Sequence, residues 1–259
     1  MNAVLLLVLL APGDVDQRAR DFGDRVHFER ADPDCDEARK VVDILSSKEH
    51  WIAAHKALEQ KLGPMPDNLS VTVDFALEGA DVGWGGNGRV RFNLKLLTEM
   101  QKKMNDLERQ RKEAAARGQR VVFRVPPVRI ERVIDHELTH LFQRGTPAPG
   151  WFVEGMAQWI SEDVNNLMGF ANAGKPVQPI DAETTDRNDA YARGHVFFKW
   201  LESRGAVQRT ADRCILQQKP WKDALQDATA MSWTEIVKAE QEWSAKEVDR
   251  LLPKDPKRR

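Results

Sequence analysis

The segment at residues 128–161 constrains the fold more than any other part of the chain. Its first half repeats apolar residues at the spacing of an α-helix, and the run GTPAPG at residues 145–150 must end that helix and reverse the chain. Residues 151–161 form a second apolar stretch with helical character. Two helices joined by a short loop can pack side by side, so we predict a helical pair here.

The first of these helices carries the pentapeptide HELTH at residues 136–140. His136 and His140 are four residues apart, so both imidazoles project from one face of the helix, one turn above the other. Two imidazoles at this spacing can bind one zinc ion. Glu137 points to the side of that face, where it could take a proton from a zinc-activated water molecule.

A catalytic zinc site needs a third protein ligand and one open position. Glu154 lies 14 residues beyond His140, about one turn into the second predicted helix, where packing would bring it opposite the histidine pair. Its neighbours are apolar, and a desolvated carboxylate needs a partner. We therefore predict that His136, His140 and Glu154 bind zinc. Asp163 is a substitute for Glu154, but it falls more than two turns further on, near the helix end.

The N-terminal half has the pattern of a small sheet with a flanking helix. Residues 26–30 predict a short strand, and residues 34–62 predict one helix or two. Apolar and polar residues alternate over 71–77, which indicates a half-buried strand; residues 85–88 (GGNG) then predict a turn, followed by a second strand. Residues 96–120 predict a solvated helix, and nearly everything from residue 128 onward has helical character.

The charge balance excludes a nucleic-acid partner. The 39 basic residues nearly cancel the 40 acidic ones, for a net charge of −1. The most basic stretch, at residues 96–120, is interrupted by acidic side chains and contains no aromatic residue on which a base could stack.

The N-terminus has two interpretations. Residues 3–11 (AVLLLVLLA) are too short for a bilayer span of about 20 residues but match the core of a signal peptide. No basic residue precedes them, so a truncated signal peptide, with residues 1–22 as leader, and a short buried strand both stay open. We expect export to the periplasm or the extracellular space, with the cytoplasm as alternative, and no stable membrane insertion. The tail at 253–259 is expected to be disordered.

Two cysteines, Cys35 and Cys214, lie far apart in the chain. They lack the close spacing of a zinc ribbon or a redox pair. They are either two unrelated thiols, which we favour, or one long-range disulfide of an exported protein.

The two motifs together resemble a known family. HELTHLFQ followed by PGWFVEGMAQW is similar to the peptidase MA-like gluzincins, zinc metallopeptidases that are distantly thermolysin-like, and residues 191–205 and 221–243 extend the resemblance. It implies a zinc cofactor and a peptide or protein substrate. It also implies an α+β, zincin-like domain at 23–252, with a small mixed sheet lobe (23–125), a mainly helical lobe (126–252) and zinc in the cleft between them.

One position departs from the thermolysin-like pattern. Gln158 stands where those enzymes carry an aspartate that orients a zinc-bound histidine. An amide can accept the same hydrogen bond, but it does not raise the basicity of the ligand as a carboxylate would. The departure puts the strength of catalysis in question, and not the binding of zinc.

Two further predictions concern the substrate. Tyr191 is the single tyrosine, stands at the head of a predicted helix and matches the family's tyrosine by position, so we expect it to donate to the transition state; His195, one turn later, is the rival. We also expect an extended peptide to pair with an edge strand at Gly88–Asn93, with Trp84 lining the cleft. An ordinary hairpin is the alternative.

Two other classes of function compete with a peptidase. One is a zinc-binding structural or interaction module with weak or no catalysis; the presence of Glu137 argues against such a degenerate site. The other is a metal-free helical protein in which the pentapeptide arises by chance. Metal content and peptide turnover distinguish the three.

Overall fold

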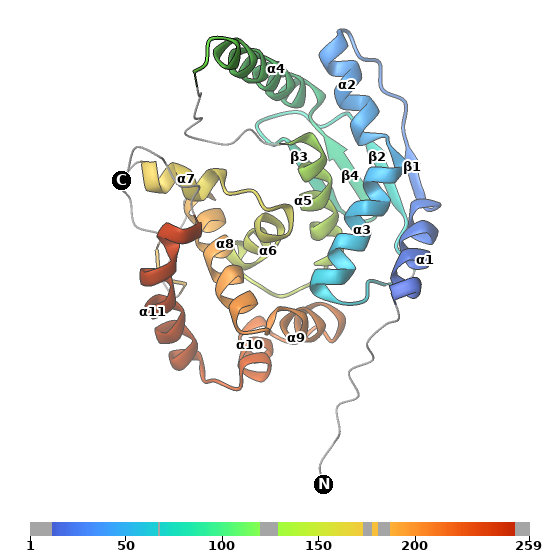
Figure 1. Ribbon diagram of the computed structural model, residues 1–259. Coiled ribbons are helices and arrows are strands. Elements are labelled where there is room, and N and C mark those ends of the chain that lie inside the picture. The colour runs from blue at the N-terminus through green and yellow to red at the C-terminus, as the bar shows by residue number, and fades with distance from the viewer. Residues whose placement is uncertain (1–11, 67, 120–128, 173–177, 181–186, 252–259) are drawn as a thin grey trace.

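The structure is a computed structural model that describes residues 12–66, 68–119, 129–172, 178–180 and 187–251 (Figure 1). It confirms an α+β fold with a small mixed sheet lobe and a helical lobe. The elements of the first lobe are α1 (Pro12–Gly23), β1 (Val26–Phe28), α2 (Asp36–Leu45), α3 (Lys48–Leu62), β2 (Val71–Asp74), β3 (Gly83–Gly86), β4 (Arg89–Phe92) and α4 (Leu94–Ala116).

The four strands have the order β1-β2-β4-β3. β1, β2 and β4 are parallel, and β3 forms an antiparallel hairpin with β4. Asn87 and Gly88 both have positive φ, as a two-residue hairpin turn of the right twist requires. The predicted turn at 85–88 is therefore too long, because its first two residues belong to β3. The predicted edge strand at Gly88–Asn93 is wrong: β4 lies inside the sheet, and β3 is at its edge.

The sheet buries one face against helices of the same lobe. Its buried apolar residues include Val73, Val90 and Phe92, and the ring of Trp51 of α3 packs at a tilt beside that of Phe92, with centroids 6.4 Å apart. Figure 1 shows α2 and α3 in front of the sheet, with α5 beside them. Alternation along the strands places charged residues on the opposite face, including Arg91. The alternation over 71–77 predicts this two-sided strand, but β2 ends at Asp74, so the predicted strand is too long by its last three residues.

Residues 12–22 of the predicted leader belong to helix α1. Its Phe22 is fully buried and stacks on His55 of α3, with ring centroids 4.4 Å apart. The apolar run 3–11 and the tail 253–259 lie outside the described residues. Within the described part of the chain, every helix is too short or too polar to cross a membrane. The domain limits and the export of the protein stay predictions.

The helical lobe follows directly in the chain. Its described elements are α5 (Ile130–Phe142), α6 (Gly150–Ser161), α7 (Asn165–Asn172), α8 (Arg187–Ser203), α9 (Val207–Ala211), the π-helix η1 (Asp212–Leu216), α10 (Trp221–Thr229) and α11 (Trp233–Leu251). Both cysteines are free; Cys35 is half-buried and Cys214 is fully buried in η1, where burial raises the pKa of its thiol to about 12. The structure thus matches the favoured interpretation of two separate thiols.

Helices α6 and α8 cross at a pair of glycines. A Cβ atom added to Gly155 would lie 2.2 Å from the Cα atom of Gly194, and one added to Gly194 would lie 2.0 Å from the carbonyl oxygen of Trp151. These are backbone atoms, which cannot rotate away. The crossing therefore needs glycine on both helices, and it fixes the position of α8, which carries Tyr191, relative to α6, which carries Glu154.

We expect Gly194→Ala to lower the free energy of unfolding by about 1–3 kcal/mol, the usual cost of overpacking. Alanine favours a helix by about 1 kcal/mol over glycine, but that gain cannot offset a collision between two backbones. Gly169→Ala is the matched control, since Gly169 is exposed on α7 and a Cβ there meets nothing within 4 Å. Urea denaturation measures both variants. If the two variants were equally stable, α6 and α8 could not approach each other as closely at Gly194 as the structure shows.

Candidate metal centre and cleft

Helices α5 and α6 form the pair that the sequence predicts. α5 ends at Phe142, the Gly145 backbone adopts positive φ, and α6 begins at Gly150. Apolar side chains from both helices, including Leu138 and Met156, are fully buried in the core. This packing turns the face of α5 with the histidines toward the first turns of α6.

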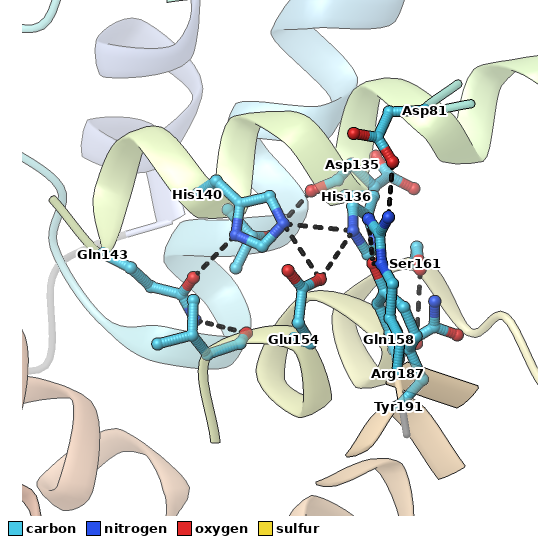
Figure 2. Close-up of polar contacts among 12 residues, drawn as sticks. Asp81, Asp135, His136, His140, Gln143, Glu154, Gln158, Ser161, Arg187 and Tyr191 are labelled. Carbon is cyan, nitrogen blue, oxygen red and sulfur yellow. Dashed lines mark hydrogen bonds and ion pairs between the residues drawn. The ribbon is translucent and has the colours of Figure 1, made fainter. Parts of the chain in front are cut away.

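The three predicted ligands converge on one point (Figure 2). The Nε2 atoms of His136 and His140 lie 3.1 Å apart, and the Oε2 atom of Glu154 lies 3.4 Å from each of them. A metal site needs at least three His, Cys, Asp or Glu side chains with their ligand atoms close together. Among the described residues, His136, His140 and Glu154 form such a group. Asp163, the substitute ligand, lines the same cleft but lies outside this group, and its carboxylate accepts the backbone N–H of Asn165.

Donor type and spacing fit a zinc ion. Zinc prefers imidazole nitrogen and carboxylate oxygen at about 2.0–2.2 Å, and tetrahedral coordination at that distance places the ligand atoms about 3.3 Å from one another. The observed separations of 3.1 and 3.4 Å lie close to that value. These residues could hold a metal ion without rearrangement.

Electrostatics within the triad keep the carboxylate ionised. Burial alone would raise the pKa of Glu154, but its hydrogen bonds to His136 and His140 and their charges outweigh burial and hold that pKa well below its usual range. Burial would lower the pKa of His140, and the contact with Glu154 reverses this and raises it. The site therefore attracts positive charge, as a cation site must.

Gln143 orients one of the two histidines, a role that the sequence analysis missed. Its Oε1 atom lies 3.0 Å from Nδ1 of His140, and its Nε2 atom donates to the carbonyl oxygen of Val153 at 2.9 Å. The second bond fixes the orientation of the amide, so Oε1 must be the atom that faces the imidazole. His140 then donates from Nδ1 and keeps the lone pair of Nε2 free for a metal. Gln158 also lines the cleft, but its Oε1 atom is buried and finds no hydrogen-bond partner among the residues that the structure describes.

Glu137 lies beside the triad in a buried position. Its side chain is buried, and its Oε2 atom has no hydrogen-bond partner within the described part of the chain. Burial raises the pKa of this carboxyl group, while the nearby His136 and His140 act in the opposite direction. A Cβ atom added to Gly83 of β3 would lie 2.4 Å from Oε1 of Glu137, so the edge strand contacts this side chain only because residue 83 is glycine.

Tyr191 reaches the same place from α8. Its ring is buried, and its centroid lies 6.1 Å from that of His136. Burial and the charge of Glu154 raise the pKa of the phenol, which stays protonated and able to donate. His195, the rival donor, is buried on the same helix, but it is not among the residues that line the cleft. Burial lowers its pKa to about 4.

The cleft that holds these groups has a volume of about 670 Å³. It runs between the edge strand β3, the face of α5 with the histidines and the start of α8, with Trp84, Glu137 and Tyr191 among its lining residues. Two residues that the sequence analysis did not single out, Asp81 and Arg187, also line it and form an ion pair across it (Figure 2).

The fold and the site define an α+β protein in which two histidines and a glutamate, residues that could hold a metal ion, converge in a cleft. The family described as peptidase of plants and bacteria (BSP) matches residues 119–239, a little under half of the chain, which includes α5, α6, α8 and the predicted metal ligands and catalytic residues. This match supports a peptidase that acts on peptides or proteins. Comparisons with curated proteins and with solved structures give no match.

Proposed function

We propose that the protein is a zinc-dependent metallopeptidase of the gluzincin type. The observation that carries the proposal is the convergence of His136, His140 and Glu154 beside the buried Glu137, in a cleft bounded by an edge strand. The match to a peptidase family over the same helices supports it. A zinc ion held there would supply Lewis acidity toward the scissile carbonyl group and the attacking water.

The side chains around the triad fit the remaining steps of peptide hydrolysis. Glu137 accepts a proton from the attacking water and delivers it to the leaving amine; its buried Oε2 atom has no hydrogen-bond partner among the described residues and so is available for this transfer. Tyr191 donates its phenolic proton to the oxygen that becomes negative in the transition state. Both groups are protected from bulk water by the lobes that bury them, which strengthens these interactions.

The edge strand β3 replaces Gly88–Asn93 as the proposed site of the substrate main chain. An extended peptide can add to an exposed strand edge through backbone hydrogen bonds. A Cβ atom added to Gly83 or Gly85 would meet Glu137 of α5. The strand therefore lies directly along the catalytic helix. Trp84 points to the other side, is 42% exposed and packs beside Arg91 of β4. A peptide-like inhibitor bound far from β3 would contradict this placement.

The experiment that tests the function is cleavage of a diverse peptide pool, with the products identified by mass spectrometry. The zinc-loaded protein should cleave peptides, the protein treated with a chelator should not, and added zinc should restore cleavage. Zinc binding without cleavage would favour the interaction module. A protein that cleaves equally well after complete metal removal would refute a metallopeptidase.

We expect Tyr191→Phe to lower kcat by about 10²–10³-fold, the usual cost of one lost oxyanion donor. The ring stays in place, so zinc content and thermal unfolding should not change. Steady-state kinetics on a cleaved peptide measures the effect. Full activity of Tyr191→Phe would mean that the donor is another group or that no side chain serves this role.

A further inference from the structure

Arg187 uses all three of its side-chain nitrogens at the mouth of the cleft. It is the first residue of α8, one turn before Tyr191. Its Nε and Nη2 atoms both donate to the phenolic oxygen of Tyr191, at 3.0 and 2.8 Å, and its Nη1 atom pairs with the carboxylate of Asp81. Figure 2 shows the guanidinium group between these two partners.

This contact determines where the phenolic proton points. A tyrosine oxygen has one proton to donate and two lone pairs that accept. The two N–H groups of Arg187 occupy the acceptor positions, so the O–H bond must point away from the guanidinium group. The ring of the proposed ligand His136 lies 6.1 Å from that of Tyr191, centroid to centroid, so the metal-binding side of the cleft is close to the phenol. Hydrogen bonds accepted from a cation also make the phenol a stronger donor.

The ion pair with Asp81 is too exposed to serve mainly for stability. The side chain of Arg187 is 60% exposed and that of Asp81 is 47% exposed. Exposed pairs of this kind contribute little to the stability of the fold. Asp81 lies two residues before β3, the proposed substrate strand. The pair therefore connects the donor on the helical lobe to the strand on the sheet lobe, across the cleft.

We propose that Arg187 is a positioning residue that acts through Tyr191: it directs the phenolic proton toward the reacting carbonyl oxygen, and Asp81 holds the guanidinium group in place. The proposal rests on the peptidase function and adds to it a residue outside the pentapeptide and its ligands. It differs from a role in which Arg187 binds a charged group of the substrate itself. The two roles predict different kinetics.

The first test is a kinetic double-mutant cycle with the zinc-loaded full chain. Arg187→Gln should lower kcat by about 10–10²-fold with little change in KM, because a donor that is misdirected but present loses part of its effect. In the Tyr191→Phe background, where no phenolic proton is left to direct, the same substitution should cost little more. Asp81→Asn should act in the same direction, and more weakly. Lys199→Gln is the matched control, because Lys199 pairs with Glu202 on the same helix, outside the cleft.

The second test needs no activity and uses the fact that Tyr191 is the single tyrosine. Protein labelled with ¹³C at the phenolic ring carbon gives one tyrosine signal by NMR, and its chemical shift reports hydrogen bonding at the oxygen. The signal should move in Arg187→Gln and in Asp81→Asn, and stay in place in Lys199→Gln. An unmoved signal in Arg187→Gln would overturn the proposal, whatever the kinetics show.

The remaining kinetic outcomes are also decisive. Equal losses from Arg187→Gln in the native and Tyr191→Phe backgrounds would mean that Arg187 does not act through the phenol. A rise in KM limited to peptides with a free terminal carboxylate, and absent from their amidated forms, would mean that Arg187 binds substrate directly. If Glu137→Gln cleaves peptides as well as the native protein, the proposed function fails instead, and the NMR signal still decides whether Arg187 holds the phenol.

Discussion

Glu137→Gln should retain its zinc while peptide turnover falls by about 10²–10⁴-fold, the range that a general base contributes. The amide has the size of the carboxylate, so the close contact with Gly83, where even a Cβ would lie 2.4 Å from Oε1, is preserved. An amide cannot take a proton from water. The three ligand atoms come from other residues, so the metal site should stay intact.

Zinc analysis and turnover of the same preparation test this prediction together. Glu131→Gln is the matched control, because Glu131 lies on the same helix and is exposed in its first turn. It should retain both zinc and activity. Loss of zinc from Glu137→Gln would make Glu137 a ligand. Retained turnover would remove it from the mechanism.

The sequence predicts the centre of this protein well because the determinants there are local. Helical spacing places His136 and His140 on one face, and the Gly- and Pro-rich loop leaves α6 only one way to return along α5. Glu154 follows from its apolar surroundings, in which a carboxylate needs a partner. The structure brings these three side chains within 3.4 Å of one another.

The edge strand could not be predicted because its residues do not favour a strand. β3 has the sequence GWGG, and glycine weakens a strand by its backbone freedom and its lack of a side chain. The strand forms because it pairs with β4. Its glycines allow the strand to lie close to α5: a Cβ at Gly85 would lie 2.4 Å from the carbonyl oxygen of Glu137. The available signal was the glycine run itself, which often marks a close approach of two backbones.

The supporting polar residues were missed for a different reason. Gln143 orients His140 only because its amide also bonds to Val153 across the loop, and neither spacing nor composition reveals that bond. Arg187 and Asp81 are 106 residues apart in the chain. For Gln143 there was a usable signal, because it is a long polar side chain one turn beyond a candidate ligand. For the Arg187–Asp81 pair, the sequence pattern contains no signal.

The native protein should contain about one zinc ion per chain, and His140→Ala should contain little or none. Removal of one of the three ligands leaves two protein donors, fewer than the three that a catalytic zinc site needs. Gln143→Ala keeps all three ligands and removes only the bond that orients His140, so its zinc affinity should fall by about 10–100-fold. The two variants should therefore form a graded series.

His27→Ala is the control for this series, because His27 is exposed on β1 and lies outside the triad. It should bind zinc as the native protein does. Elemental analysis after dialysis gives the stoichiometry, and competition with a chelator of known affinity gives the dissociation constants. Added zinc should raise the midpoint of thermal unfolding of the native protein and of His27→Ala, since a ligand that binds only the folded state stabilises it, but not that of His140→Ala. A native protein that folds and contains no zinc, even when zinc is supplied, would refute both the metal site and the peptidase mechanism built on it.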